Sequence, residues 1–274
     1  REKLFERTGK GAVLTACGSE FIAYAQPAYR QFRLLGEFCA TLHDPALQHL
    51  SVASQYLRFA SSVFTHICRE FRETPYEFSF LEGAMQEVVE MVRAQEAELG
   101  LIVVPLEQRQ LLLYAFQKND LAYRPLRQEE LAIIVNEHHP LCRDDSMTVT
   151  IEQLKEYPLV IYRDTNYSFS TVWSGLGLDP VLRKVIVQDR ASLYEVISRT
   201  DAFTLASHNI HAYEKTPYYT GMSILRLQER KALLEIGFIT SRNRPLSTIA
   251  TRYLELLQDT MEAQSRHQDN QTSL

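Results

Sequence analysis

The sequence predicts an α/β protein with two lobes, preceded by one long helix. Residues 15–42 show a continuous helical apolar repeat, and two successive sets of apolar strands and amphipathic helices follow it. A final helix is predicted after Pro245. Alternating strands and helices are typical of a parallel α/β sheet. Two such sets with a returning C-terminal helix indicate two lobes joined by two crossings.

The first residues predict a hairpin with a basic tip. Gly9 and Gly11 flank Lys10, which suits a tight turn between two short strands. Thr15 is placed to cap the helix that follows. A basic tip of this kind can lie on a phosphate backbone, although an ordinary surface hairpin has the same pattern.

A long helix is predicted next, with one narrow apolar seam. The seam positions alternate spacings of four and three residues and are Phe21, Ala25, Ala28, Phe32, Leu35, Cys39 and Leu42. This repeat is typical of a helix that packs lengthwise on a helix of a partner chain, so we expect dimerisation there. The alternative is a helix buried within one subunit. Pro27 lacks a backbone N–H, and we expect a kink one turn before it.

The charge is unevenly distributed along the 274 residues. Residues 1–43 hold six basic and four acidic side chains, which gives this part a net charge of +2. Because the whole chain carries −5, the remainder carries −7. The body is therefore a poor candidate for binding nucleic acid, and the basic beginning is a weak one. Four scattered cysteines without a CxxC pair favour a reducing compartment over a disulfide framework or a zinc site. No membrane-spanning run or signal peptide is visible, so we expect a cytoplasmic protein.

The N-terminal pattern matches a known family at many fixed positions. Leu4-Phe5-x-Arg7-x-Gly9-x-Gly11-x-x-Leu14-Thr15-x-x-Gly18-x-x-Phe21 resembles the wing and the start of the linker helix of the LysR-type transcriptional regulators. In that family a winged helix-turn-helix comes first and an effector-binding domain comes last. The resemblance implies DNA-backbone contacts at Arg7 and Lys10. The chain begins without Met and inside the wing motif, so we expect the recognition helix to lie upstream.

The body is predicted from apolar runs and helical periodicity. In the first set, strands are expected at residues 50–53, 76–81, 99–104, 121–126 and 131–135, and helices at 56–71, 84–97 and 110–117. In the second set, helices are expected at 150–157, 168–175 and 191–199, and strands at 159–162, 185–188, 203–206, 225–227 and 234–240. The last helix is expected to run from Pro245 to about Ala263.

The body also resembles the LysR-type effector domain, which has the type-2 periplasmic-binding-protein architecture. Two stretches resemble its crossings between lobes: 130–135 followed by His139-Pro140-Leu141, and Arg244-Pro245-Leu246-Ser247. The implied division is a winged helix-turn-helix remnant at 1–14, a linker helix at 15–43, a first lobe at 47–128 and 241–265, and a second lobe at 129–240. Thr200-Asp201-Ala202 stands where family members often carry a glycine-rich segment.

The sequence carries no pattern typical of catalysis. HExxH, P-loop and GxSxG motifs are absent. The adjacent His138 and His139 point to different sides and are a poor metal pair. Glu82 beside Gly83 suits a ligand contact or a helix-entry charge better than a general base. We therefore expect no enzyme, no cofactor and no metal.

Binding is the better use of the loops that follow the predicted strands, because ligands of α/β sheets lie at the carboxyl ends of strands, against helix N-termini. The candidate effector-binding residues are Ser54, Gln55, Tyr56, Glu82, Gly83, Asp164, Thr165, Asn166, Arg190, Ser192 and Ser207. Ser54 and Ser192 are equally consistent with helix caps that touch no ligand. Arg163 and Arg190 can hold a carboxylate and nearby acids can hold an amine, so both ligand classes stay open.

These observations predict a ligand-responsive, DNA-binding regulator of the LysR type. It is expected to be a homodimer or homotetramer that binds a small effector between its lobes. One alternative is a solute-binding module, which the coiled-coil helix and the absent signal peptide disfavour. The other is a transferase on the same fold, which the lack of a nucleophile–base pair and of a P-loop disfavours.

Overall fold

A computed structural model describes residues 2–9, 11–43, 47–143, 147–163, 172, 176–178, 183–207, 221–228 and 233–272. The chain divides into two compact units. One comprises Arg1–His49 with Glu73–Glu77, and the other comprises Leu50–Arg72 with Phe78–Leu274. Each unit is described by itself.

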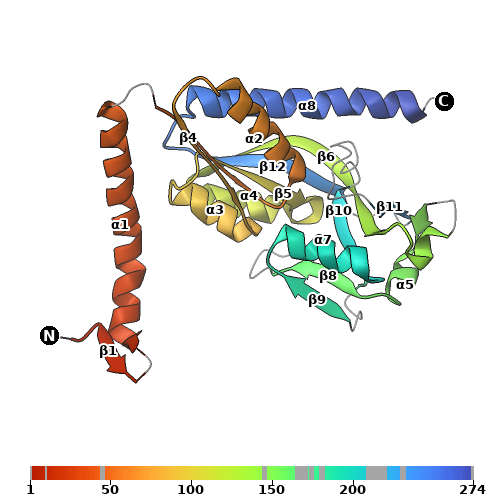
Figure 1. Cartoon of the computed structure of the whole chain (residues 1–274), viewed down its shortest axis with the longest axis horizontal. Coiled ribbons are helices and arrows are strands. Elements are labelled where there is room, and N and C mark those ends of the chain that lie inside the picture. Colours follow the sequence, from red (N-terminus) through yellow and green to blue (C-terminus); the bar gives the residue numbers. More distant parts are fainter. Residues whose placement is uncertain are drawn as a thin grey trace. The chain divides into compact units, whose positions relative to one another are not determined.

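The first unit contains a hairpin and one long helix. β1 (Phe5–Thr8) pairs antiparallel with β2 (Gly11–Leu14), and α1 spans Ala16–His43 (Figure 1). The Oγ1 atom of Thr15 caps α1 by accepting a hydrogen bond of 2.9 Å from the backbone N–H of Gly18. A Cβ at Gly18 would clash with the carbonyl oxygen of Leu4, so only glycine fits there. The predicted hairpin, cap and helix are confirmed.

Helix α1 exposes large apolar side chains within its unit. Among its described side chains, the exposed large hydrophobic ones are Phe21, Tyr24, Tyr29, Phe32 and Leu35. Phe32 and Leu35 on the predicted seam are 72 % and 57 % exposed. Tyr24 and Tyr29 occupy the positions that flank the seam and widen its apolar face. The helix runs through Pro27 as one element. The side chains of Cys39 and Leu42 lie outside the described residues.

The second unit is built on a mixed sheet whose strands lie in the order β4-β3-β5-β12-β6-β11-β7, with β10 also paired to β6. These strands are β3 (Gln48–Ser54), β4 (Tyr76–Glu82), β5 (Leu99–Pro105), β6 (Leu121–Asn136), β7 (Thr148–Val149), β10 (Thr204–Ser207), β11 (Met222–Leu227) and β12 (Leu233–Ser241). β3 runs parallel to β5, and β12 lies antiparallel between β5 and β6. A separate parallel pair consists of β8 (Leu159–Tyr162) and β9 (Lys184–Val187).

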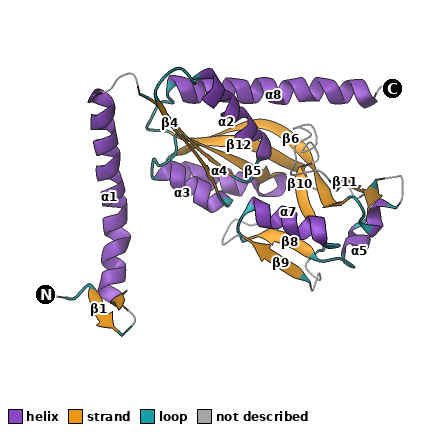
Figure 2. Cartoon of the chain, in the orientation of Figure 1, coloured by secondary structure: helices purple, strands orange, loops and turns teal. Residues whose placement is uncertain are grey.

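Helices cover both faces of the sheet around β5 (Figure 2). The helices of this unit are α2 (Arg58–Glu70), α3 (Met85–Arg93), α4 (Arg109–Lys118), α5 (Ile151–Leu154), α7 (Arg190–Arg199) and α8 (Thr248–Thr272), with short 3-10 turns at Leu106–Gln108 and Pro140–Cys142. α2 and α8 pack in one buried cluster, and α3 and α4 pack in another. β5 is buried at every residue because it is covered on both faces. No helix in the described parts of the chain is long and apolar enough to cross a membrane.

A third buried cluster belongs to the second lobe. It joins the end of β6 to β8, α7 and β11 through residues such as Ile134, Val160 and Ile197. The predicted fold class is therefore confirmed: a two-lobe α/β domain preceded by a long helix and a hairpin. Of the predicted helix at 168–175, only Val172 is among the described residues.

Strand β6 connects the lobes as one element of 16 residues. The sequence predicted two strands, because the polar run between residues 126 and 131 resembles a break. In the structure, polar side chains of this run have hydrogen-bond partners. Arg127 Nε donates to Glu129 Oε1 at 2.8 Å, and Gln128 Nε2 donates to a carboxylate oxygen of Glu235 at 3.2 Å. Opposite it, the register with β12 shifts at a bulge between Ile236 and Gly237.

The return crossing differs from the sequence-based expectation. β12 pairs with β5 from Leu234 to Thr240, so this stretch lies in the first lobe's part of the sheet. The resemblance to the LysR-type effector domain implies instead that residues up to 240 belong to the second lobe and that the crossing lies at 244–247. A short apolar strand gives no sign of which lobe it joins, because the choice depends on its pairing partner.

His139 is a structural residue whose burial predicts a pH dependence of stability. It is 1 % exposed. Its Nδ1 accepts a hydrogen bond of 3.1 Å from the backbone N–H of Leu141, and its Nε2 lies 3.1 Å from the carbonyl oxygen of Asp201. Burial lowers the pKa of His139 below its ordinary value of 6.5, against the weaker opposing effect of Asp201. These contacts suit the neutral ring, with the proton on Nε2.

We expect acid to destabilise the fold through His139. The folded-state pKa is the lower one, so the unfolded chain takes up a proton below pH 6.5 that the folded chain does not. The free energy of unfolding should therefore fall between pH 7.5 and about 5.5, and should fall less in a His139→Asn variant. Thermal melts at both pH values measure the difference. His138→Gln, at an exposed neighbour, serves as the control and should keep the wild-type dependence. Equal dependence in all three proteins would contradict this assignment.

Candidate functional site

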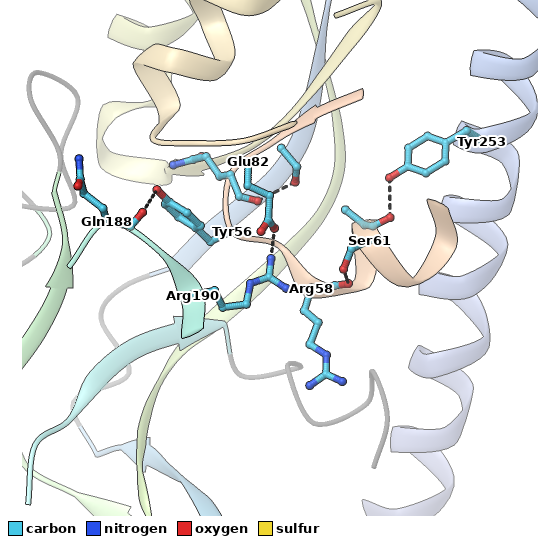
Figure 3. Close-up of polar contacts among 10 residues, drawn as sticks. Tyr56, Arg58, Ser61, Glu82, Gln188, Arg190 and Tyr253 are labelled. Atoms are coloured by element: carbon cyan, nitrogen blue, oxygen red, sulfur yellow. Dashed lines mark hydrogen bonds and ion pairs between the residues drawn. The ribbon is translucent and has the colours of Figure 1, made fainter. Parts of the chain in front are cut away.

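Loops from both lobes meet at the ends of four strands. Tyr56 follows β3 and Glu82 ends β4 in the first lobe, whereas Tyr162 ends β8 and Gln188 follows β9 in the second. Arg190, the first residue of α7, joins them. These five residues are called the interlobe contact below. Figure 3 shows Tyr56 and Glu82 facing Gln188 and Arg190.

Tyr56 makes two of the contacts between the lobes. Its ring stacks on that of Tyr162, with a centroid separation of 3.7 Å and an interplanar angle of 10°. Its hydroxyl donates a hydrogen bond of 3.0 Å to the backbone carbonyl of Gln188 (Figure 3). One aromatic side chain of the first lobe therefore touches two strand ends of the second.

An ion pair makes the other contact. Arg190 Nη2 donates to Oε1 of Glu82, and both side chains are more than two-thirds buried. Burial raises the pKa of the Glu82 carboxyl, and the Arg190 guanidinium offsets only part of this rise. The Nε atom of Arg190 is buried and has no hydrogen-bond partner in the described part of the chain. The guanidinium therefore retains a buried donor at Nε that makes no hydrogen bond there.

Three predicted residues of the first lobe shape the loop backbone. Ser54 is fully buried, and its hydroxyl donates to the carbonyl of Gln55 at 2.6 Å. Gln55 Oε1 accepts a hydrogen bond of 2.6 Å from the backbone N–H of Val103, which ties the loop to β5. The backbone N–H of Gly83 donates to the carbonyl of Ser54 at 3.1 Å. A Cβ at Gly83 would press on the Glu87 carboxylate, which itself accepts from the N–H of Ala84.

In the second lobe, Ser192 is part of a helix cap. Asp189 caps α7 by accepting hydrogen bonds of 2.8 Å from Ser192 N and 2.7 Å from Ser192 Oγ. These bonds lower the pKa of the Asp189 carboxyl. Asp164, Thr165 and Asn166 lie outside the described residues, as do Lys10 and the side chain of Ser207.

No sequence pattern singles out Tyr162 or Gln188 as a site residue. Tyr162 was recognised only as the end of a strand, and Gln188 takes part through its backbone carbonyl, which any residue possesses. The contact of Glu82 with Arg190 joins residues 108 positions apart, and no local pattern indicates it. No group of three metal-binding side chains exists among the described residues. The arrangement can hold a small ligand by stacking and by charge.

Comparison with known proteins places the chain in a family. Residues 57–262 match the family described as the LysR substrate binding domain. The chain belongs to this family. The resemblance to LysR-type transcriptional regulators is thereby confirmed over the body of the chain. No curated protein matches the sequence.

Solved structures of LysR proteins share the fold at low sequence identity. Full-length CbnR in complex with its target DNA is 16 % identical, with a TM-score of 0.59 over 90 % of this chain and 82 % of that one. The effector-binding domain of QuiR in complex with shikimate is 14 % identical, with a TM-score of 0.53 over 77 % and 95 %. The CcmR regulatory domain of Synechocystis PCC6803 with 2-PG is 15 % identical, with a TM-score of 0.54 over 77 % and 96 %.

Proposed function

We propose that this LysR-type, ligand-responsive regulator binds its small-molecule effector at the interlobe contact. The single observation that supports this site is the meeting of Tyr56 and Glu82 with Tyr162, Gln188 and Arg190 from the other lobe. A molecule bound there touches both lobes, so its affinity depends on how they are arranged. That dependence is what a ligand needs in order to shift a protein between two states.

We assign different roles to the candidate residues. Tyr56 and Arg190 are proposed to contact the effector directly, and Glu82, which pairs with Arg190, is proposed to border the site. Ser54, Gln55 and Gly83 are proposed to hold the loop that presents Tyr56, and Ser192 acts through the Asp189 cap of α7. Asp164, Thr165, Asn166 and Ser207 remain candidates for direct contact on the basis of the sequence.

The signal is proposed to reach DNA through the assembly. The exposed apolar face of α1 pairs with the same face of a second copy, which gives a homodimer or, with further contacts, a homotetramer. Arg7, which is exposed on β1, and Lys10 are proposed to contact the phosphate backbone. We further propose that the chain acts in the cytoplasm and is not an enzyme. The shikimate and 2-PG complexes of QuiR and CcmR support a small organic effector.

A metabolite screen with two matched tyrosine variants tests the site. Small metabolites are screened by thermal shift on the full chain, and each hit is titrated by calorimetry. Tyr56→Ala should weaken binding about tenfold or more, because an aromatic contact and a hydrogen bond together contribute on the order of 1.5 kcal/mol. Tyr114→Ala, at an exposed position of α4, should bind like the wild type. Equal affinity in all three proteins would place the effector elsewhere.

A further inference from the structure

We propose that the effector is a planar aromatic carboxylate whose ring enters between Tyr56 and Tyr162 and whose carboxylate takes the place of Glu82 on Arg190. This inference rests on the proposed function, because it names the chemistry of the molecule bound at the interlobe contact. Two independent features, the tyrosine pair and the arginine, each specify one half of such a ligand.

The tyrosine pair specifies a flat ring. At 3.7 Å and 10°, the two rings form a nearly parallel stack with centroids closer than the 4.5–7 Å range that aromatic pairs prefer. The electron-rich faces therefore oppose each other. Because the rings come from different lobes, separating the lobes by about one further stacking distance of ~3.5 Å leaves two parallel faces with room for a third ring. An electron-poor ring between them meets both faces favourably.

The arginine specifies a carboxylate. Glu82 accepts from Nη2 of Arg190, while the buried Nε finds no partner among the described residues. A ligand carboxylate can accept two parallel hydrogen bonds from Nε and Nη2, a geometry that matches the guanidinium fork. Glu82 is a replaceable partner, since its burial disfavours the ionised form even beside Arg190. The ligand thus satisfies a donor that Glu82 leaves unused.

The same contacts disfavour an amine ligand, which is one of the two ligand classes that the sequence alone allows. Of the two described acids at this place, Glu82 is paired with Arg190 and Asp189 accepts two hydrogen bonds from Ser192. A cationic ligand would have to break one of these arrangements and would lie beside the Arg190 guanidinium. A non-aromatic anion would leave the two tyrosine rings stacked on each other and would gain nothing from their faces.

Six probe molecules separate the two halves of the proposal. The full chain is titrated by calorimetry with benzoate, 4-nitrobenzoate and 2-naphthoate, and with cyclohexanecarboxylate, benzamide and benzylamine. We expect at least one of the aromatic acids to bind at least tenfold more tightly than cyclohexanecarboxylate, benzamide and benzylamine. Among the aromatic acids, 4-nitrobenzoate should bind more tightly than benzoate. Failure of all three aromatic acids to bind at millimolar concentration would overturn the proposal, as would equal binding of cyclohexanecarboxylate or benzamide.

Three variants and one control variant then test the residues. Arg190→Gln and Tyr162→Leu should each weaken the best aromatic acid at least tenfold, whereas Arg199→Gln, on the same helix but exposed, should not. Glu82→Gln should bind the acid several-fold more tightly, because the competing carboxylate is removed. If Glu82→Gln binds the acid more weakly than the wild type does, the proposal that the ligand carboxylate replaces Glu82 on Arg190 is overturned. If a non-aromatic metabolite from the screen loses affinity in Tyr56→Ala, this inference fails while the proposed function stands.

Discussion

Glutamate at positions 32 and 35 should dissociate the assembly. Phe32 and Leu35 are strongly exposed in the single chain and lie on the predicted seam of α1. Burial of such side chains at a helix–helix interface contributes about 2–5 kcal/mol each, and the introduced carboxylates would have to be buried as well. The Phe32→Glu/Leu35→Glu variant should therefore run as a monomer in light scattering at concentrations where the wild type is a dimer or larger.

A matched variant separates the seam from the helix. Ala23 and Gln26 lie on the same helix, outside the seam, and both are exposed. Ala23→Glu/Gln26→Glu adds two carboxylates at these positions and should keep the wild-type mass. If the seam variant keeps its mass, or if both variants lose it equally, α1 does not associate through this seam.

Replacing Arg127 by methionine should destabilise the fold by about 3–5 kcal/mol, the cost of leaving one member of a buried ion pair without its partner. Arg127 is paired with the buried Glu129, with side chains 15 % and 0 % exposed. Its Nη1 also donates to the backbone carbonyl of Met261 at 3.0 Å, which ties β6 to α8. Arg127→Met keeps most of the side-chain volume and leaves the Glu129 carboxylate without its cation. Urea unfolding measures the loss of stability.

Two further variants give this prediction its controls. Arg124→Met, on the same strand but exposed, should change stability by less than about 0.5 kcal/mol. The double variant Arg127→Met/Glu129→Met should recover most of the loss, since an apolar pair of similar volume often replaces a buried ion pair without cost. If Arg127→Met is as stable as the wild type, the ion pair contributes little to stability. If the double variant is less stable than Arg127→Met, the lost stability does not come from the buried charge of Glu129.

Periodic patterns in the sequence were sufficient for most elements of the fold. The apolar runs of β3 and β5 and the seam of α1 each predicted an element with nearly correct bounds. The predicted bounds were wrong where contacts between side chains or an unusual backbone conformation determine where an element ends. Helix α3 ends at Arg93, before the predicted Ala97, because Gln95 has a φ of 61°. The polar run inside β6 remains a strand because Arg127 pairs with Glu129 within the run and Gln128 donates to Glu235 of β12.

The candidate site was predictable in its loops but not in its contacts. Placing ligand-binding residues after strand ends selected Tyr56, Glu82 and Arg190, which the structure brings together. The same rule selected Ser54 and Gln55, whose polar side-chain atoms bind the backbone instead. A donor-rich loop looks the same in sequence whether its side chains serve a ligand or its own peptide groups. The stacking of Tyr56 on Tyr162 depends on how two distant loops meet.

The position of β12 has a consequence for how the protein is made. In the sheet, β12 lies between β5 and β6. In the chain, both of these strands come before it, and most of the second lobe separates β6 from β12. A nascent chain that has completed both of these apolar strands cannot join them until Leu233–Ser241 has left the ribosome. Until then the strands present open hydrogen-bonding edges of the kind that promote aggregation. We therefore expect the first lobe to fold late, after the second is already synthesised, and to depend on chaperones in the interval.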